Sequence, residues 1–353
     1  MNIQDRRIIN QFKKERNDYI ELYEVVYSMI EDAVKQDNIF CMSIGGRVKE
    51  VSSLQGKVSR KSGKYARLTD ITDLCGIRVI CYFSDDVDRI GMIMSQLFDV
   101  DYANSIDKRE IISATQFGYL SLHYVCSLRP EGNYPSNILG KKFEIQIRTV
   151  LQHTWAEIEH DLGYKSDFGV PRKFRREFSR IAGLLEIADE KFAELRENLN
   201  KYSLDIKNKI AEDSAEDILI DRVSLNEYML GNKRMAEFTA RISDATGAEV
   251  EYINPENYLE QLDFLGKKTI GDLSLMLTDN SELAFSMAVK MIKESELDII
   301  SSNVPLRYLC RAEIVGKKYS REQIKRFVGL AIHDVERIEE QTDRLQQYID
   351  ISD

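Results

Sequence analysis

Hydrophobic residues recur every three or four positions in three long stretches of the chain. The first stretch predicts a helix over residues 1–36, with an apolar face made of Ile9, Phe12, Tyr19, Tyr23, Val26, Ile30 and Ala33. After Pro171, a favourable first residue of a helix, an unbroken heptad pattern covers residues 174–206. A third heptad pattern covers residues 324–349, with Thr342 at its one polar position. We expect three long helices that pack within the chain or join subunits of a homo-oligomer.

Between residues 76 and 149 the spacing changes from a helical to a strand period. Runs rich in β-branched and aromatic residues predict strands at 76–83, 120–128 and 142–149. Residues 87–98 predict a helix between the first two strands, and a further helix is expected over residues 43–65. This alternation predicts a mixed α/β module.

Residues 215–318 have mostly helical spacing. The expected fold class is therefore α+β, with a mixed β-sheet domain flanked by helices and followed by an all-α C-terminal region. The predicted division has four parts: an N-terminal helix at 1–40, the α/β domain at 41–170, a long heptad helix at 171–212, and a helical region for regulation or oligomerisation at 213–353.

Composition and charge narrow the class of protein. The chain has 353 residues and a net charge of −10, which argues against bulk attraction to DNA or to an anionic membrane surface. Its five cysteines never occur as C-x-x-C, so a disulfide framework or a cysteine zinc site is not expected. No run approaches the roughly 18 apolar residues of a spanning helix. We expect a cytoplasmic protein without a membrane partner.

Against this acidic background, residues 41–67 carry seven lysines and arginines and a single acid, Glu50. In a helix, Lys49, Ser53 and Lys57 follow one another at intervals of four and share one face. Such a face suits a polyphosphate, although a solvated basic surface is the alternative interpretation. A Walker loop is excluded, because no Ser or Thr follows directly after Lys57.

Polar residues also accompany the predicted strands. Asp73 comes just before the strand that carries Arg78, where a carboxylate can bind Mg²⁺ beside phosphates or can simply form a turn. Strand alternation places Glu144, Gln146 and Arg148 on one face. Three polar residues on a central strand are costly to bury unless they serve a ligand.

Two further groups of polar residues lie in the segments before and after that strand. Tyr119, Ser121 and His123 alternate on one face behind a glycine, so the face offers a ring to a base and a donor to a phosphate, or simply packs as a half-buried strand. The helix after residue 149 brings polar side chains to one side, and a hydrogen-bond network is favoured over zinc there. These side chains are His153, Glu157, His160 and Asp161.

Four ordered motifs then identify a family. They are R-x-K-x-x-x-S-x-x-x-K at 47–57, D-L-C-G-I-R at 73–78, G-Y-x-S-x-H at 118–123 and E-I-Q-I-R-T at 144–149. Together residues 40–166 resemble the RelA/SpoT nucleotide pyrophosphokinases in their small, synthetase-only form. The resemblance implies a nucleotidyltransferase-like synthetase domain. It also implies transfer of the β,γ-pyrophosphate of ATP to the ribose 3′-hydroxyl of GDP or GTP, which makes the alarmones ppGpp and pppGpp and releases AMP.

The same resemblance implies a role for each matching residue. The residues implied to bind ATP include two that sandwich the adenine, Arg47 and Arg78, and four that hold the phosphates, Lys49, Ser53, Lys57 and Arg60. The implied catalytic carboxylates, which also hold Mg²⁺, are Asp73 and Glu144, and Glu144 is the candidate base. The residues implied on the acceptor side are Tyr119, which stacks on the base, His123, which contacts phosphate, and Gln146 and Arg148, which order the site.

Two features leave the acceptor open. Members that make alarmones often carry a Lys and an Asn just before G-Y, whereas residues 114–117 here read Ala-Thr-Gln-Phe. The family also includes toxins that pyrophosphorylate the 3′ end of tRNA, some with a helical neutralising element, and the long helical C-terminal region here has no assigned role. The partners expected are ATP with GTP or GDP, or ATP with a tRNA 3′ end. A catalytically inactive alarmone-binding module is the non-enzymatic alternative, and the intact set of motif residues argues against it.

Overall fold

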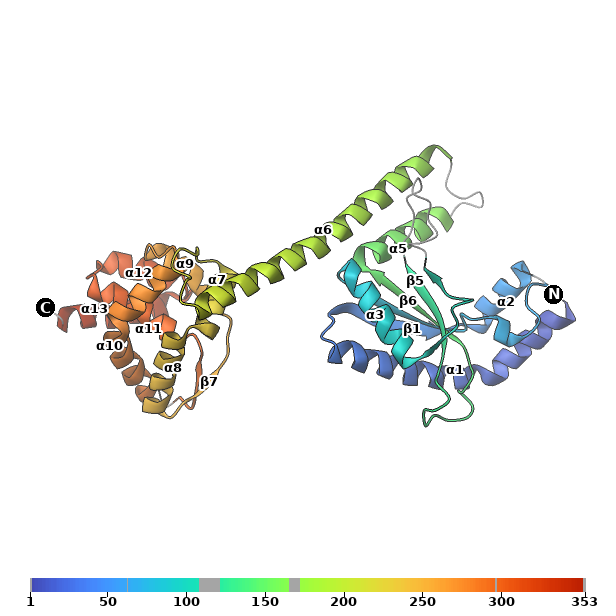
Figure 1. The fold of residues 1–353 in the computed structure, drawn as a ribbon, viewed down its shortest axis with the longest axis horizontal. Helices are drawn as coiled ribbons and strands as arrows, with labels where there is room; N and C mark the ends of the chain where they lie inside the picture. The colour runs from blue at the N-terminus through green and yellow to red at the C-terminus, as the bar shows by residue number, and fades with distance from the viewer. Residues whose placement is uncertain (1, 62, 108–120, 165–171, 296, 352–353) are drawn as a thin grey trace. The chain divides into compact units, whose positions relative to one another are not determined.

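The chain divides into two units, Met1–Arg196 and Glu197–Asp353, shown as a ribbon in Figure 1. The structure is a computed structural model that describes residues 2–61, 63–107, 121–164, 172–295 and 297–351. The boundary between the units falls inside helix α6 (Arg172–Ala211). Each unit is described by itself.

The first unit combines helices with a mixed sheet. In chain order its elements are α1 (Ile3–Gln36), β1 (Cys41–Val48), α2 (Val51–Arg60), the short 3-10 helix η1 (Leu68–Asp70), β2 (Cys75–Cys81), α3 (Ser84–Leu97), β3 (Asp99–Val100), β4 (Ile106–Asp107), β5 (Leu122–Ser127), β6 (Phe143–Thr149), α5 (Val150–Tyr164) and the first part of α6.

The sheet has the strand order β1-β2-β6-β5-β3, and β4 also pairs with β5. Strands β2 and β6 are parallel, whereas the other neighbours are antiparallel. Because side chains alternate along a strand, Ile77, Val79, Ile145 and Ile147 point to one face. They are buried there in one hydrophobic core with residues of α1 and α3. The opposite face is left for polar side chains.

Helix α1 confirms the N-terminal helix expected from the sequence. The side chain of Asn2 caps it by accepting from the backbone nitrogen of Asp5 at 2.7 Å. Its buried positions recur every three or four residues and include Phe12, Leu22 and Ile30. This apolar stripe fixes the helix against the sheet.

The helix expected over residues 43–65 is only half right. Residues 41–48 form strand β1, which pairs with β2 along its length, and the helix α2 covers only Val51–Arg60. A Cβ atom at Gly46 would lie 2.1 Å from the carbonyl oxygen of Gly76, so this close pairing requires glycine. Residues 41–48 form a strand because they pair with β2. The local sequence does not reveal this strand, because Gly45 and Gly46 interrupt its apolar period.

The second unit is mostly helical. Its elements after α6 are α7 (Arg222–Gly231), α8 (Lys233–Thr246), β7 (Glu249–Glu251), the 3-10 helix η2 (Pro255–Tyr258), α9 (Leu259–Phe264), α10 (Ile270–Glu294), β8 (Ile299–Ser301), α11 (Val304–Gly316), α12 (Arg321–Gly329) and α13 (Val335–Ile351). The expected all-α region therefore needs one correction, since β7 and β8 form a short parallel pair. Strands of three residues are too short to produce a readable period.

The third heptad pattern forms two helices instead of one. Helices α12 and α13 are separated by residues 330–334, and Val335 is 69% exposed although the pattern places it in the seam. Ile324 on α12 and Leu345 on α13 are both buried in the core of the second unit. The buried Thr342 donates from Oγ1 to the carbonyl oxygen of Ile338 at 2.7 Å. This segment therefore folds back on its own unit.

Helix α6 matches the heptad helix expected over residues 171–212. Several apolar residues of its pattern remain exposed, among them Phe192, Leu195 and Leu199. A homo-oligomer formed through this stripe stays a prediction, as does the division into four parts. Over the residues that the structure describes, no helix is both long enough and apolar enough to cross a membrane.

One carboxylate is buried where α6 meets the end of β6. Asp189 is 4% exposed, and the hydroxyl of Thr149 donates to its Oδ2 at 2.6 Å. Burial raises the pKa of Asp189 to about 6, against the lowering effect of this hydrogen bond. The folded chain therefore binds this proton more tightly than the unfolded chain, so stability falls as pH rises from about 4 through 6.

Replacing this carboxylate should stabilise the first unit at alkaline pH. Asp189→Asn is expected to raise the free energy of unfolding by about 1–3 kcal/mol at pH 8 and by about a third of that amount at pH 4.5. Trp155, the only tryptophan, packs against Phe178 of α6, so urea unfolding followed by its fluorescence measures the change. Glu190→Gln on the exposed side of α6 is the control. A gain of the same size at both pH values would contradict the explanation.

Candidate active site

The polar face of the sheet brings together predicted residues from three strands. Arg78 on β2, Gln146 on β6 and His123 on β5 are cross-strand partners in one row. Cross-strand partners point to the same face. Glu144 lies two residues before Gln146, and Arg47 is carried by the neighbouring edge strand β1 in the same row as Glu144. One face therefore presents guanidinium, carboxylate, amide and imidazole groups together.

Two glycines keep part of this face flat. Gly45 pairs with Arg78, and Gly76 lies between Arg47 and Glu144 across the strands. A Cβ atom built on either glycine would have no heavy atom within 4 Å. The face is thus open beside both guanidinium groups, where a planar ring has room to lie.

Asp73 lies in the turn before β2 and holds two lysines. Its Oδ2 atom is 2.7 Å from the Nζ atoms of both Lys49 and Lys57. Lys49 directly follows β1 and its backbone nitrogen donates to the carbonyl oxygen of Leu74 at 2.8 Å, which fixes it beside the turn. Burial alone would raise the pKa of Asp73, but the hydrogen bonds and charges of the two lysines lower it. The carboxylate is therefore ionised at neutral pH.

Glu144 ends a chain of hydrogen bonds along β6. Arg148 donates to Oε1 of Gln146 at 2.5 Å, and Nε2 of Gln146 donates to Oε1 of Glu144 at 2.8 Å. Nδ1 of His123 lies 3.0 Å from the same Oε1 atom. Burial raises the pKa of Glu144, and the nearby charge of Asp73 raises it further, but the bonds from His123 and Gln146 produce a net lowering. The two carboxylates are thus close enough to influence each other.

Arg78 is held from outside the sheet by a residue of α5. Its NH1 atom lies 3.1 Å from Oε1 of Glu157, and Nδ1 of His153 lies 3.7 Å from the same oxygen. The sequence placed Glu157 and His153 in a polar network but gave no sign of the contact with Arg78. The contact joins residues 79 positions apart, so no local pattern can reveal it.

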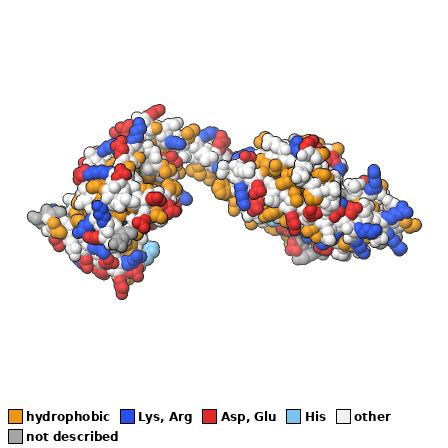
Figure 2. Space-filling view, turned by 90° about the horizontal axis from the view of Figure 1, so that it is seen from below, with side chains coloured by type: hydrophobic (Ala, Val, Ile, Leu, Met, Phe, Trp, Pro, Cys, Tyr) orange, Lys and Arg blue, Asp and Glu red, His pale blue; other side chains and the backbone are white. Residues whose placement is uncertain are grey.

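Other predicted residues are exposed or make contacts within their own helix. Arg47, Ser53 and Arg60 are exposed, and Nε of Arg60 donates to the carbonyl oxygen of Gly56 in its own helix at 3.2 Å. The predicted helical face is only partly right, because Lys49 precedes α2. Tyr119 falls outside the described residues. Figure 2 shows Lys and Arg side chains gathered at the end of the first unit where Figure 1 places α2.

The donor set fits a magnesium ion that arrives with a nucleotide. Oδ1 of Asp73 and Nε2 of His123 are buried without a hydrogen-bond partner among the described residues. In the same part of the chain no three His, Cys, Asp or Glu side chains form a cluster able to hold a metal ion. Magnesium is commonly bound by one or two carboxylates and completes its shell with phosphate oxygens and water. Asp73 and Glu144 suit that arrangement.

Comparison with known proteins gives a family for residues 46–168. Residues 46–168 match the family model described as the region found in RelA / SpoT proteins. GTP pyrophosphokinase YjbM of Bacillus subtilis (strain 168) is 34% identical over 158 residues, which are 43% of this chain and 71% of that protein. The chain belongs to the RelA/SpoT family.

Two further proteins are similar to this RelA/SpoT protein. GTP pyrophosphokinase YwaC of Bacillus subtilis (strain 168) is 29% identical over 157 residues, 44% of this chain and 73% of that protein. The crystal structure of the small alarmone synthetase 1 from Bacillus subtilis has a TM-score of 0.45 and 25% identity, and the match covers 54% of this chain and 99% of that one. The family match itself ends at residue 168.

The pH dependence of this RelA/SpoT protein tests the contact between His123 and Glu144. Because hydrogen bonds lower the pKa of Glu144, activity should fall only when pH drops through that lowered value. His123→Phe removes one of the donors, so the acid limb of kcat/KM should move to higher pH. A pH profile of the variant measures this. The exposed His333 provides the control His333→Phe, and an acid limb that stays in place in His123→Phe would contradict the assignment.

Proposed function

We propose that this chain transfers the β,γ-pyrophosphate of ATP to the ribose 3′-hydroxyl of GDP or GTP, making ppGpp or pppGpp and releasing AMP. The observation that carries the proposal is the pair of ionised carboxylates, Asp73 beside Lys49 and Lys57, and Glu144 beside His123. Phosphoryl transfer needs positive charge, metal and positioning more than a covalent nucleophile. Kinship with a protein named GTP pyrophosphokinase supports the same chemistry.

ATP is proposed to lie across β1, β2 and α2. Arg47 and Arg78 would stack on the two faces of the adenine, which the open floor over Gly45 and Gly76 supports. The phosphates would meet the ammonium groups of the lysines that now contact Asp73. The other residues proposed to contact the phosphates are Ser53 and Arg60, which are exposed on the same short helix.

Asp73 and Glu144 are proposed to hold Mg²⁺. When bound, the ion neutralises phosphate charge and aligns the phosphate oxygens. Lys49 and Lys57 already place their positive charge at Asp73. Their ammonium groups can contact the phosphates instead without a large movement.

The reaction then forms one bond and breaks one. The acceptor 3′-oxygen bonds to the β-phosphorus of ATP, and the bond from that phosphorus to the bridging oxygen of the α-phosphate breaks, so AMP leaves with the bridging oxygen. The hydroxyl proton passes to Glu144. Because hydrogen bonds lower the pKa of Glu144, it holds the hydroxyl as an acceptor and takes the proton only when transfer is well advanced.

The acceptor is proposed to lie toward β5 and the far end of β6. His123 would contact a phosphate, and Gln146 and Arg148 would hold Glu144 in position through their hydrogen bonds. Tyr119 would stack on the acceptor base. A tRNA 3′ end is the competing acceptor, and the same assay separates the two.

An acceptor assay tests the proposed reaction. With γ-labelled ATP, label is expected to move into GDP or GTP, and Glu144→Gln should reduce the rate by at least about a hundredfold, since Gln can accept a hydrogen bond but not the proton. Thin-layer chromatography of the nucleotides measures the transfer. The exposed Glu131 gives the matched control Glu131→Gln. Label that enters only bulk tRNA would refute the nucleotide acceptor, and label that enters nothing would refute the enzyme.

A second variant tests the adenine contact. Arg78→Gln should raise the KM for ATP about five- to thirtyfold, because stacking of a guanidinium on a ring contributes on the order of 1–2 kcal/mol. The KM for GTP should change little. Initial rates at varied substrate concentrations separate the two constants. Arg129, which donates to the carbonyl oxygen of Ser95 at 2.9 Å, gives the control Arg129→Gln. An equal rise in both KM values would contradict the assignment of Arg78 to the adenine.

A further inference from the structure

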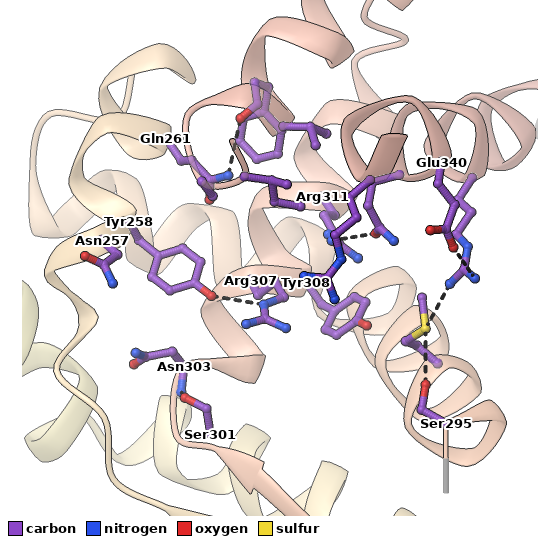
Figure 3. A pocket seen from close by; sticks show the side chains of 18 of the residues that line it. Asn257, Tyr258, Gln261, Ser295, Ser301, Asn303, Arg307, Tyr308, Arg311 and Glu340 are labelled. Carbon is purple, nitrogen blue, oxygen red and sulfur yellow. Dashed lines mark hydrogen bonds and ion pairs between the residues drawn. The ribbon is translucent and has the colours of Figure 1, made fainter. Parts of the chain in front are cut away.

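The second unit contains a large pocket that the family match does not reach. Its volume is about 690 Å³, and its wall is built by residues of η2, α9, α11, α12 and α13 together with the end of α10. Figure 3 shows polar and aromatic side chains that converge on it from these elements. Pockets of this size are typical of sites for nucleotide-sized ligands.

Helix α11 turns one polar face toward the pocket. Asn303, Arg307 and Arg311 follow at intervals of four residues, so they share this face, and all three line the cavity. Helix α13 adds Arg337 and Arg344. Four arginines therefore line the pocket, and its acidic lining residue is Glu340.

The positive charge of the pocket lining contrasts with the net negative charge of the second unit. Residues 197–353 contain 30 acidic and 20 basic residues, whereas residues 1–196 contain 29 of each. A random patch of the second unit would therefore be acidic. The concentration of arginines in one pocket needs a specific cause.

The two arginines of α11 have neutral partners. Nε of Arg307 donates to the hydroxyl of Tyr258 at 3.0 Å, and NH2 of Arg311 donates to Oε1 of Gln341 at 2.9 Å, contacts drawn in Figure 3. No carboxylate in the described part of the chain lies within salt-bridge distance of either. Glu340 pairs with Arg344 instead, at 2.8 Å.

The charge of Arg311 is unfavourable without an anion, whereas at Arg307, despite desolvation, the contact with Tyr258 raises the pKa. Desolvation, together with the charges of Arg307 and Arg344, lowers the pKa of the half-buried Arg311. Like charges four residues apart on a helix also destabilise it. A bound oxyanion would neutralise both guanidinium groups and accept the donors that their planar shape directs into the pocket.

Uncharged groups complete the pocket. Oδ1 of Asn303 is buried without a hydrogen-bond partner in the described part of the chain. Tyr258 and Tyr308 line the pocket beside the arginines with 8% and 4% of their surfaces exposed, and the guanidinium of Arg311 lies 5.3 Å from the ring centre of Tyr308. A ligand with both a ring and more than one phosphate uses all of these features.

We propose that this pocket binds a nucleoside polyphosphate, at a second site separate from the polar sheet face of the first unit. Arg307 and Arg311 bind its phosphates, and the two tyrosines pack against its base or sugar. A single inorganic phosphate would leave most of the cavity unfilled. The C-terminal unit would then bind a ligand of the same class as the proposed substrates of the first unit. Such a second site suits a regulatory role.

Hydrogen–deuterium exchange of the full chain tests this site without measuring activity. ATP and GTP, added separately at millimolar concentration, serve as probes. At least one of them is expected to slow exchange in peptides from α11 and α13. Arg307→Gln and Arg311→Gln should abolish this protection, and Arg311→Lys should keep part of it by keeping the charge. Protection of peptides from β1 and α2 reports on the first unit independently.

Arg326→Gln is the matched control, because Arg326 is exposed on α12 and is not part of the pocket lining. It should leave the protection of α11 unchanged. Exchange without ligand shows whether each variant folds, and Arg311→Gln should not speed it, because the change removes an uncompensated charge. The proposal is overturned if neither nucleotide protects α11 or α13, or if the protection persists in both Arg307→Gln and Arg311→Gln.

Discussion

The parallel pairing of β2 with β6 sets Gly76 beside Glu144 and Arg78 beside Gln146. That register brings the turn at Asp73, which enters β2, close to the carboxylate of Glu144, so that each charge affects the other. A shift of one residue would turn the polar side chains of β6 into the core and expose its isoleucines. The core formed by α1, α3 and the apolar sheet face therefore fixes the chemistry on the other face.

Two carboxylates of like charge can lie close together only if cations and donors offset their repulsion. Here the offset is divided: Lys49 and Lys57 stabilise Asp73, whereas His123 and Gln146 stabilise Glu144. Both groups stay ionised although burial opposes ionisation. In the proposed reaction, a nucleotide with a divalent cation would replace these internal contacts, the lysines contacting phosphates and the carboxylates holding the cation.

The sequence was sufficient where a pattern was local. Alternation of Glu144 and Gln146 with apolar neighbours predicted both strand β6 and its polar face, and the family motifs named most of the residues that the structure gathers there. It was insufficient where the partner lies far away along the chain. Strand β1 depends on pairing across Gly46, and the hold on Arg78 depends on Glu157 in a later helix. The final heptad also failed, because a period describes which face is apolar but not where the chain turns between α12 and α13.

Positively charged side chains have different partners in the two units. In the first unit the lysines near the proposed ATP site are neutralised by Asp73, so an incoming anion must compete with a carboxylate already in place. In the second unit the hydrogen-bond partners of Arg307 and Arg311 among the described residues are a hydroxyl and an amide, so an anion there breaks no ion pair. Desolvating a guanidinium is costly unless a charge compensates it, and this cost falls on the partly buried Arg311 more than on the exposed Arg307. A folded unit with an excess of acids had many carboxylates that could have been placed there. Their absence from these two arginines, in the part of the chain the structure describes, is the physical reason to regard the pocket as built for a ligand and not only for packing.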